Sequence, residues 1–439
     1  MKKILSLLLI IFIISCSQQG KNITIISGKL VGYDSNPVKN AKIKCSSIGK
    51  LNLVTSTIDD DGSFVIKTDH KGYLDVEFTG ENHHSAEVPI LLSKPEKIEL
   101  NVQLKSKEYK NNANIQFIDT SSISAKYHVI NKWFNEYNKK YNLEKTGEEI
   151  FSKIDREHDI ETKSLLCFLY MKKFFTTPGD YQNIDLNKAK HILQIIPPSS
   201  IVWTMRPNLP TWFWYILPQK DHNIVNAYIE RISYENKYPS VKAEAINYLL
   251  ATAEMEEDSS KIKKFYNRLV KECPRSFRTK DAKFKYDILA PGKRVPTFSV
   301  TSIENPDETF TDKTMLGDVY LIGFWATTWG YCRGDCIGQM PYLHEAYDKY
   351  KKFGFTILSI SLDDSPEAVR MFRQGKWKMP WNHAFLEGKL DNEITKRFNV
   401  NGYTPILVDS KGKIIANQNN LREEKLLKTL DNYFRVKSN

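Results

Sequence analysis

The segment from Tyr320 to Leu343 constrains the fold of this chain more than any other part of the sequence. It reads YLIGFWATTWGYCRGDCIGQMPYL, in which an apolar stretch over 320–324 is followed by a loop and then by a helical pattern. An uninterrupted apolar stretch is typical of a strand that is covered on both faces of its sheet. We expect the helix to begin at about Cys336. The segment therefore predicts an α/β domain in which Cys332 and Cys336 lie at a strand–helix junction.

Residues 290–439 continue this alternation of strands and helices. FTILSISL is a second apolar strand, whereas SPEAVRMFRQGKW and LREEKLLKTLDNYF have the period of amphipathic helices. Strands that alternate with helices predict a sheet that contains parallel strands. We therefore expect one α/β domain over 290–439.

The strand–helix junction favours thiol chemistry. Unpaired backbone N–H groups at the start of a helix and the positive end of the helix dipole both stabilise a thiolate over a thiol. Arg333, which is adjacent to Cys332, should act in the same direction. Cys332 and Cys336 are therefore the candidate catalytic residues.

At these residues the chain resembles the TlpA/ResA-type thioredoxin-like thiol–disulfide oxidoreductases. FWAT ends at Thr327, Trp329 precedes the thiols, and QMP stands where the family usually has EMP. Downstream, ILSISLDDSPEAVRMF fits the family's next strand and helix, and FNVNGYTPILVDSKGKII fits its cis-proline segment. The resemblance implies a thioredoxin-like fold over 290–439. It also implies a membrane-anchored enzyme that exchanges or reduces disulfides of periplasmic client proteins and takes electrons from a membrane thiol donor.

The resemblance further implies roles for individual residues. Cys336, counted back from Pro341, matches the family's resolving cysteine. Cys332 is then the attacking thiol, expected in the loop before the helix, and the two cysteines form a reversible disulfide. The expected supporting residues of the active site are Trp329, Arg333, Gln339, Thr404 and Pro405.

The chain departs from the family pattern in several places. Its cysteines are spaced Cys-x-x-x-Cys instead of Cys-x-x-Cys, Gln339 replaces a Glu, and Gly323 stands where thioredoxins have a buried Asp. Because a Gln side chain cannot carry a proton, we expect exchange to be slow or to use water. Pro405 is the candidate cis-proline. Since its segment is shorter than usual, a trans Pro405 at a strand edge is the alternative.

The N-terminus has the pattern of a bacterial lipoprotein signal. Two lysines precede the apolar run Ile4–Ile14, which is too short to span ~30 Å of hydrocarbon but suits a signal peptide. The sequence IISC that follows resembles a lipobox, which implies a signal over 1–16 and a lipid on Cys16. No acidic residue follows at 17–19. We therefore expect a lipid anchor in the envelope of a Gram-negative bacterium, facing the periplasm; an ordinary signal peptide is the alternative.

Two further domains are predicted between the signal and the α/β domain. Residues 22–106 show the period of two of antiparallel strands, as in Leu74, Val76 and Phe78. The string SGKLVGYDSNPVKNAKI resembles carboxypeptidase-regulatory-like β-sandwiches, which implies an all-β sandwich there. Residues 107–288 have helical patterns such as ETKSLLCFLYMKKFF and form the expected α-helical domain. Its aromatic cluster is predicted to be core rather than a docking surface: Trp203, Trp212 and Trp214.

Composition limits the partners. The chain of 439 residues has 63 Lys and Arg against 52 Asp and Glu, a net charge of +11, but no arginine-rich stripe. We therefore expect no nucleic-acid partner. No metal and no cofactor are predicted.

Of the 6 cysteines of the chain, five remain when Cys16 is set aside, so at least one thiol is free. We expect reduced, buried thiols at Cys45, Cys167 and Cys273.

Three other interpretations stay open. Cys-x-x-x-Cys is also the spacing of Sco-type copper chaperones on the same fold, and thiolates suit Cu(I). His344, expected to face solvent, or His383 would then have to supply a ligand. A peroxiredoxin-like peroxidase is disfavoured because Thr328 lies four residues before Cys332 instead of three. The third interpretation is a lipoprotein that docks client proteins and has a degenerate redox site. The retention of both cysteines argues against it.

Overall fold

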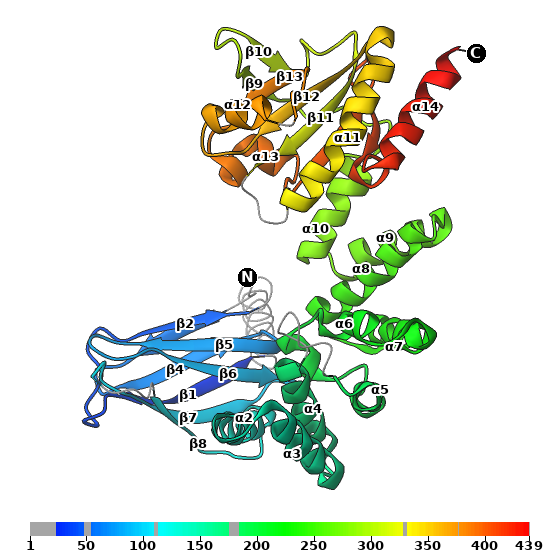
Figure 1. Ribbon diagram of the computed structural model, residues 1–439. Coiled ribbons are helices and arrows are strands. Elements are labelled where there is room, and N and C mark those ends of the chain that lie inside the picture. Colours follow the sequence, from blue (N-terminus) through cyan, green and yellow to red (C-terminus); the bar gives the residue numbers. More distant parts are fainter. Residues whose placement is uncertain are drawn as a thin grey trace, which may run out of the picture. The chain divides into compact units, whose positions relative to one another are not determined.

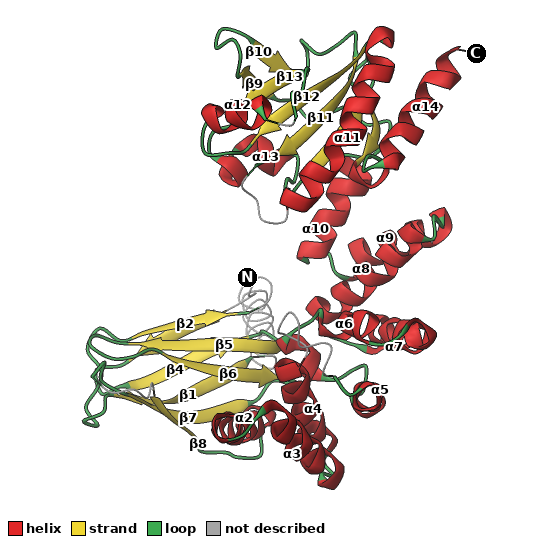
Figure 2. Ribbon diagram, viewed as in Figure 1, coloured by secondary structure: helices red, strands yellow, loops and turns green. Residues whose placement is uncertain are grey.

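The protein is described by a computed structural model that covers residues 23–47, 54–108, 113–174, 184–327, 332–375 and 377–438 (Figure 1). The chain divides into two compact units, Met1–Thr279 and Lys280–Asn439. The first unit begins with strands and continues with helices, and the second alternates between them (Figure 2). The predicted signal over 1–16 lies outside the described residues. The first unit contains the predicted sandwich and the predicted helical domain as far as Thr279, and residues 280–288 of that domain fall in the second unit. The boundary between the sandwich and the helical domain remains a prediction.

The strands of the first unit form two sheets. A five-stranded sheet has the order β3-β4-β1-β7-β8, and a three-stranded sheet has the order β2-β5-β6. Side chains of both sheets belong to one hydrophobic core, which includes Ile26 of β1 and Val76 of β5. The strands are β1 (Thr24–Val31), β2 (Lys42–Ser46), β3 (Val54–Ile58), β4 (Ser63–Thr68), β5 (Gly72–Thr79), β6 (Ala86–Leu92), β7 (Lys97–Leu104) and β8 (Ala113–Phe117).

The predicted alternation of buried residues is confirmed, but two details differ. Leu74, Val76 and Phe78 are buried along β5, with half-buried residues between them. The expectation of a purely antiparallel arrangement is wrong for β1 and β7, which pair in parallel. The strands β2–β6 between them supply the long connection that parallel neighbours need. The strands also continue past residue 106, because ANIQF of β8 has the same period of two and pairs with β7.

Two of the first helices of the first unit begin at polar capping residues. Ser122 and Asn142 each accept a hydrogen bond from a backbone N–H of the following turn, as is usual at an N-cap. Trp203 is fully buried, as predicted, whereas Trp212 and Trp214 are half-buried. The helices are α2 (Ile123–Lys140), α3 (Leu143–Arg156), α4 (Ile160–Phe174), α5 (Leu186–Ile195), η3 (Ile201–Met205), α6 (Leu209–Ile216), η4 (Gln219–Asp221), α7 (His222–Glu235), α8 (Pro239–Met255) and α9 (Ser259–Glu272).

The second unit is built on a seven-stranded mixed sheet. Its order is β10-β9-β13-β12-β11-β14-β15, with β11 parallel to β12 and antiparallel to β14. The strands are β9 (Ser299–Ser302), β10 (Thr309–Thr311), β11 (Val319–Trp325), β12 (Phe355–Ser361), β13 (Asn382–Phe385), β14 (Thr404–Val408) and β15 (Ile414–Asn417). Helix α10 (Phe277–Lys283) begins in the first unit and ends in the second. The other helices of the second unit are η5 (Phe284–Ile288), α11 (Cys332–Tyr350), η6 (Lys351–Phe353), α12 (Pro366–Gln374), η7 (Lys389–Asp391), α13 (Glu393–Arg397), η8 (Gln418–Asn420) and α14 (Glu424–Ser438).

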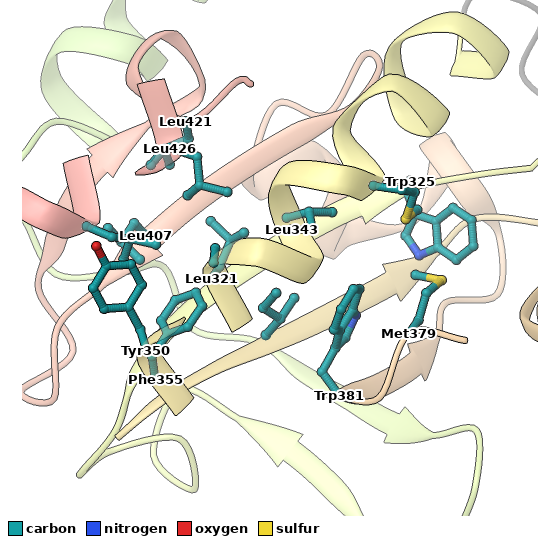
Figure 3. Close-up of a cluster of buried hydrophobic side chains, with 14 of the residues drawn as sticks. Leu321, Trp325, Leu343, Tyr350, Phe355, Met379, Trp381, Leu407, Leu421 and Leu426 are labelled. Carbon is teal, nitrogen blue, oxygen red and sulfur yellow. The ribbon is translucent and has the colours of Figure 1, made fainter. Parts of the chain in front are cut away.

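The central strand β11 is buried on both faces, as its apolar sequence predicts. Leu321 and Trp325 point into a core that α11, α12 and α14 cover, and Figure 3 shows this core. Tyr320, Ile322 and Phe324 point into a second core on the opposite face of the sheet. Because successive residues of a strand alternate between faces, Gly323 lies on the α11 side between Leu321 and Trp325.

Candidate active site around Cys336

Helix α11 begins four residues earlier than the sequence suggests. Its first residue is Cys332, so this cysteine does not lie in a loop before the helix, and Cys336 is one turn inside it. Gly334 does not end the helix, because a glycine costs a helix interior only about 1 kcal/mol. The buried side chains of Cys336, Met340 and Leu343 share one helix face and hold it on the sheet.

Cys336 is the one predicted catalytic residue whose side chain the structure describes. It is 3% exposed and is disulfide-bonded. Cys45, Cys167 and Cys273 carry free thiols, as predicted. The side chains of Cys332 and Arg333, and the whole of Trp329, lie outside the described residues. The pairing of Cys332 with Cys336 therefore stays a prediction.

The three free thiols are poor nucleophiles. Burial raises the pKa of Cys45 and of Cys273 to about 11, and that of Cys167 to about 12. Cys167 and Cys273 are buried as predicted, but Cys45 is only half-buried because β2 alternates between exposed and half-buried side chains. Since the thiolate is the reactive form, these cysteines do not compete in disulfide exchange near neutral pH.

A cavity of about 10 Å³ lies next to Cys336. This is about the space that one water molecule needs. Besides Cys336, its lining contains three side chains that can donate a hydrogen bond and whose role the sequence did not reveal: the indole of Trp325, the hydroxyl of Ser359 and the phenol of Tyr403. The residues that line it are Leu321, Gly323, Trp325, Cys336, Met340, Leu343, Ile357, Ser359, Met379 and Tyr403.

Gln339 holds two helices together. It is 3% exposed, and its Oε1 accepts a hydrogen bond of 2.6 Å from the backbone N–H of Glu423, next to the start of α14. Gln339 does not line the cavity at Cys336. Its described contact is therefore structural, a tie between α11 and α14.

Thr404 and Pro405 are buried at the start of β14. Pro405 lies opposite Gly323 in the register of β11 and β14. The described peptide bonds include no cis bond, so the expected cis-proline is wrong. The pairing of β14 with β15 begins only at Ile406, so Pro405 does not have to donate a hydrogen bond to β15. The proline therefore fits the strand in its favoured trans form.

Asp363 is a site residue that the sequence analysis missed. It is 1% exposed and follows β12. Its Oδ1 accepts hydrogen bonds from the backbone N–H (2.8 Å) and the hydroxyl (2.7 Å) of Thr327, and its Oδ2 accepts one from the Ser361 hydroxyl (2.8 Å). Asp363 thus fixes the last described residue before the segment that leads to Cys332. The sequence contained one signal for this role, the pair Asp363-Asp364 directly after the apolar strand FTILSISL.

The two histidines considered as copper ligands lie in an aromatic cluster. His344 is half-buried against Trp377 and Trp381, which corrects the expectation that it faces solvent. His383 is buried, and one of its ring nitrogens is hydrogen-bonded to the carbonyl of Met379. Desolvation by burial lowers the pKa of His383 to about 4. Neither histidine lines the cavity at Cys336.

Known proteins that are similar to this chain are thioredoxin-like and are named thiol-disulfide oxidoreductases. Residues 317–414 match the thioredoxin-like family. The chain is 31% identical over 153 residues to the thiol-disulfide oxidoreductase ResA of Bacillus thuringiensis subsp. konkukian, which covers 34% of this chain and 80% of that protein. It is 32% identical over 153 residues to ResA of Bacillus cereus, with the same coverage of 34% and 80%. The thioredoxin domain of a thiol-disulfide oxidoreductase from Bacteroides vulgatus is 27% identical, with a TM-score of 0.29, and covers 33% of this chain and 98% of that one.

Proposed function

The chain belongs to the family of the thiol–disulfide oxidoreductase ResA, and we propose that its second unit exchanges disulfides with client proteins through Cys332 and Cys336. The state of Cys336 carries this proposal. It is a buried, disulfide-bonded cysteine in the helix that follows the central strand of a thioredoxin-like sheet, while Cys45, Cys167 and Cys273 are free thiols of high pKa.

The proposed exchange has two steps. The Cys332 thiolate attacks one sulfur of the client disulfide, and the other client sulfur leaves as a thiolate that takes up a proton. The thiolate of Cys336 then attacks the Cys332 sulfur, so that the client leaves as a dithiol and a Cys332–Cys336 disulfide forms. The client gains two electrons. A membrane thiol donor, proposed here on the family resemblance, returns the pair to its reduced state.

The proposed location is the bacterial envelope. The lipobox-like sequence before Cys16 supports a lipid anchor that faces the periplasm of a Gram-negative bacterium. In the described parts of the chain, no helix is both long and apolar enough to cross a membrane. The two strand layers around one core support a carboxypeptidase-regulatory-like β-sandwich in the first unit, which would hold the redox unit away from the membrane.

Trapping of mixed disulfides tests this function. Cys336→Ser should accumulate clients bound to Cys332, because the resolving thiol is gone, whereas Cys332→Ser should trap few. Cys45→Ser is the matched control, since that thiol is free and half-buried. The complexes are counted on non-reducing gels and the bonds are mapped by mass spectrometry. A native disulfide from Cys336 to any cysteine other than Cys332 would overturn the assignment.

A further inference from the structure

Tyr403 occupies the space above Gly323 on the α11 side of the sheet. A Cβ atom placed on Gly323 would lie 3.7 Å from Cε2 and 3.9 Å from the hydroxyl oxygen of Tyr403. These are ordinary contact distances, so a methyl group fits, but a longer side chain would enter the volume of the ring. Tyr403 is 5% exposed, and its backbone carbonyl accepts a hydrogen bond of 3.1 Å from Arg422. The position at which thioredoxins have an aspartate is thus covered by a phenol.

The indole of Trp325 faces the same cavity from the end of β11. Trp325 is 2% exposed, and its Nε1 has no hydrogen-bond partner within the described part of the protein. Figure 3 shows the indole beside Met379, which also lines this cavity. An indole nitrogen can only donate, and a buried donor without an acceptor is costly. Within the part of the chain that the structure describes, the indole N–H of Trp325 is therefore available to an acceptor in the cavity.

No Asp, Glu, His, Lys or Arg is among the described residues that line the cavity. Its titratable lining residues are Cys336 and Tyr403. Burial raises the pKa of Tyr403, and the charge of Arg422 opposes this only in part, so the phenol keeps its proton. The hydroxyl of Ser359, which also lines the cavity, accepts a hydrogen bond of 2.8 Å from Trp381 Nε1 and keeps its own proton to donate. The polar groups around Cys336 are thus donors.

We propose that Tyr403, together with Trp325, is an active-site residue that hydrogen-bonds the Cys336 thiolate and stabilises it without a carboxylate. The proposal rests on the exchange function given above. In the second step the S–H bond of Cys336 breaks, its proton passes to water, and its sulfur forms the bond to Cys332 while the client sulfur leaves with the electron pair. The donors stabilise the anion that attacks, but they cannot take its proton.

Titration of Cys336 tests the proposal. In reduced Cys332→Ser protein, thiolate absorbance is followed against pH below the range in which the other thiols and the tyrosines ionise. Tyr403→Phe should lower the thiolate fraction of Cys336 at neutral pH about tenfold, since one hydrogen bond to a charged group is lost. Trp325→Phe should act in the same direction. Tyr320→Phe is the matched control, because Tyr320 is a buried tyrosine on the opposite face of β11.

Unchanged titration curves in Tyr403→Phe and Trp325→Phe would overturn the proposal, and so would an equal shift in Tyr320→Phe. If Tyr403→Phe does not fold, Trp325→Phe decides the outcome alone. Turnover of a client disulfide by the wild-type protein is measured separately. A wild type that does not turn over clients refutes the function, whereas one that turns over clients without these shifts refutes only the roles of Tyr403 and Trp325.

Discussion

Asp363 joins the end of β12 to the approach to the active site, and every hydrogen bond that its carboxylate makes is one that it accepts. Thr327 donates twice to Oδ1 and Ser361 donates once to Oδ2. An amide of the same shape would offer N–H hydrogens in place of one acceptor. The carboxylate of Asp363 therefore holds Thr327, the last described residue before the segment that leads to Cys332.

Asp363→Asn should lower the free energy of unfolding of the second unit by about 1–3 kcal/mol. The amide N–H of the new side chain would face a donor of Thr327 or Ser361 in a buried position. Mixed-disulfide formation by Cys332 should slow as well, since the segment before it loses its fixed start. Urea denaturation and the rate of client trapping measure the two effects. Asp364→Asn is the control, because Asp364 is exposed and pairs with Lys389. Equal behaviour of the two variants would contradict the role of Asp363.

His383 makes the stability of the second unit depend on pH. Its pKa falls from 6.5 to about 4 in the folded state through burial. Between these values the unfolded chain binds more protons than the folded one, so stability rises with pH. The contribution is complete above about pH 6.5 and is lost progressively as the pH falls toward 4, by about 3 kcal/mol in all.

His383→Asn should flatten this part of the curve of unfolding free energy against pH, because the titrating group is removed. Urea denaturation at a series of pH values from 4 to 7 provides the measurement. His158→Asn, at an exposed histidine, should leave the slope as it is. If the slope persisted in His383→Asn, another group would have to cause it.

At the scale of elements, the sequence predicted the central strands β11 and β12. It did not predict where α11 begins or which side chain lies over Gly323. The apolar runs identified β11 and β12, because strands buried on both faces need no alternation. The start of α11 was misplaced, since the packing of Cys336 and Met340 on the sheet outweighs the cost of Gly334. Tyr403 was missed because its position over Gly323 depends on the register of β11 and β14, which are far apart in the chain.

The tie between α11 and α14 depends on Gln339. Gln339→Ala should lower the free energy of unfolding by about 1 kcal/mol, because the part-buried hydrogen bond from the N–H of Glu423 is lost. Gln339→Glu, which restores the family's residue, keeps an acceptor at this position and should lose less. Chemical denaturation of the variants provides the comparison, with Gln374→Ala at an exposed helix position as control. A loss as small as that of the control would show that the bond adds little.

At the scale of the whole molecule, composition and periodicity predicted the order of strand-rich, helical and α/β parts. They did not predict that the first two would fall into one compact unit, because that depends on contacts between segments without shared periodicity. The parallel pairing of β1 with β7 was missed for a similar reason. A period of two identifies a strand and its buried face, but it contains no information on the direction of its neighbour.

The last prediction concerns the attachment of the whole molecule to the membrane. Two forces could hold it there: a lipid on Cys16, and the attraction of a net charge of +11 to anionic lipids. They respond differently to salt, because 1 M salt shortens the Debye length to ~3 Å but leaves the burial of acyl chains in place. The wild-type protein should therefore stay in the membrane fraction after a high-salt wash. Cys16→Ala should appear in the wash or keep its unprocessed N-terminus, and Cys45→Ala should behave as wild type. Fractionation with lipid labelling and intact mass measures this, and lipid labelling of Cys16→Ala equal to that of the wild type would refute the anchor.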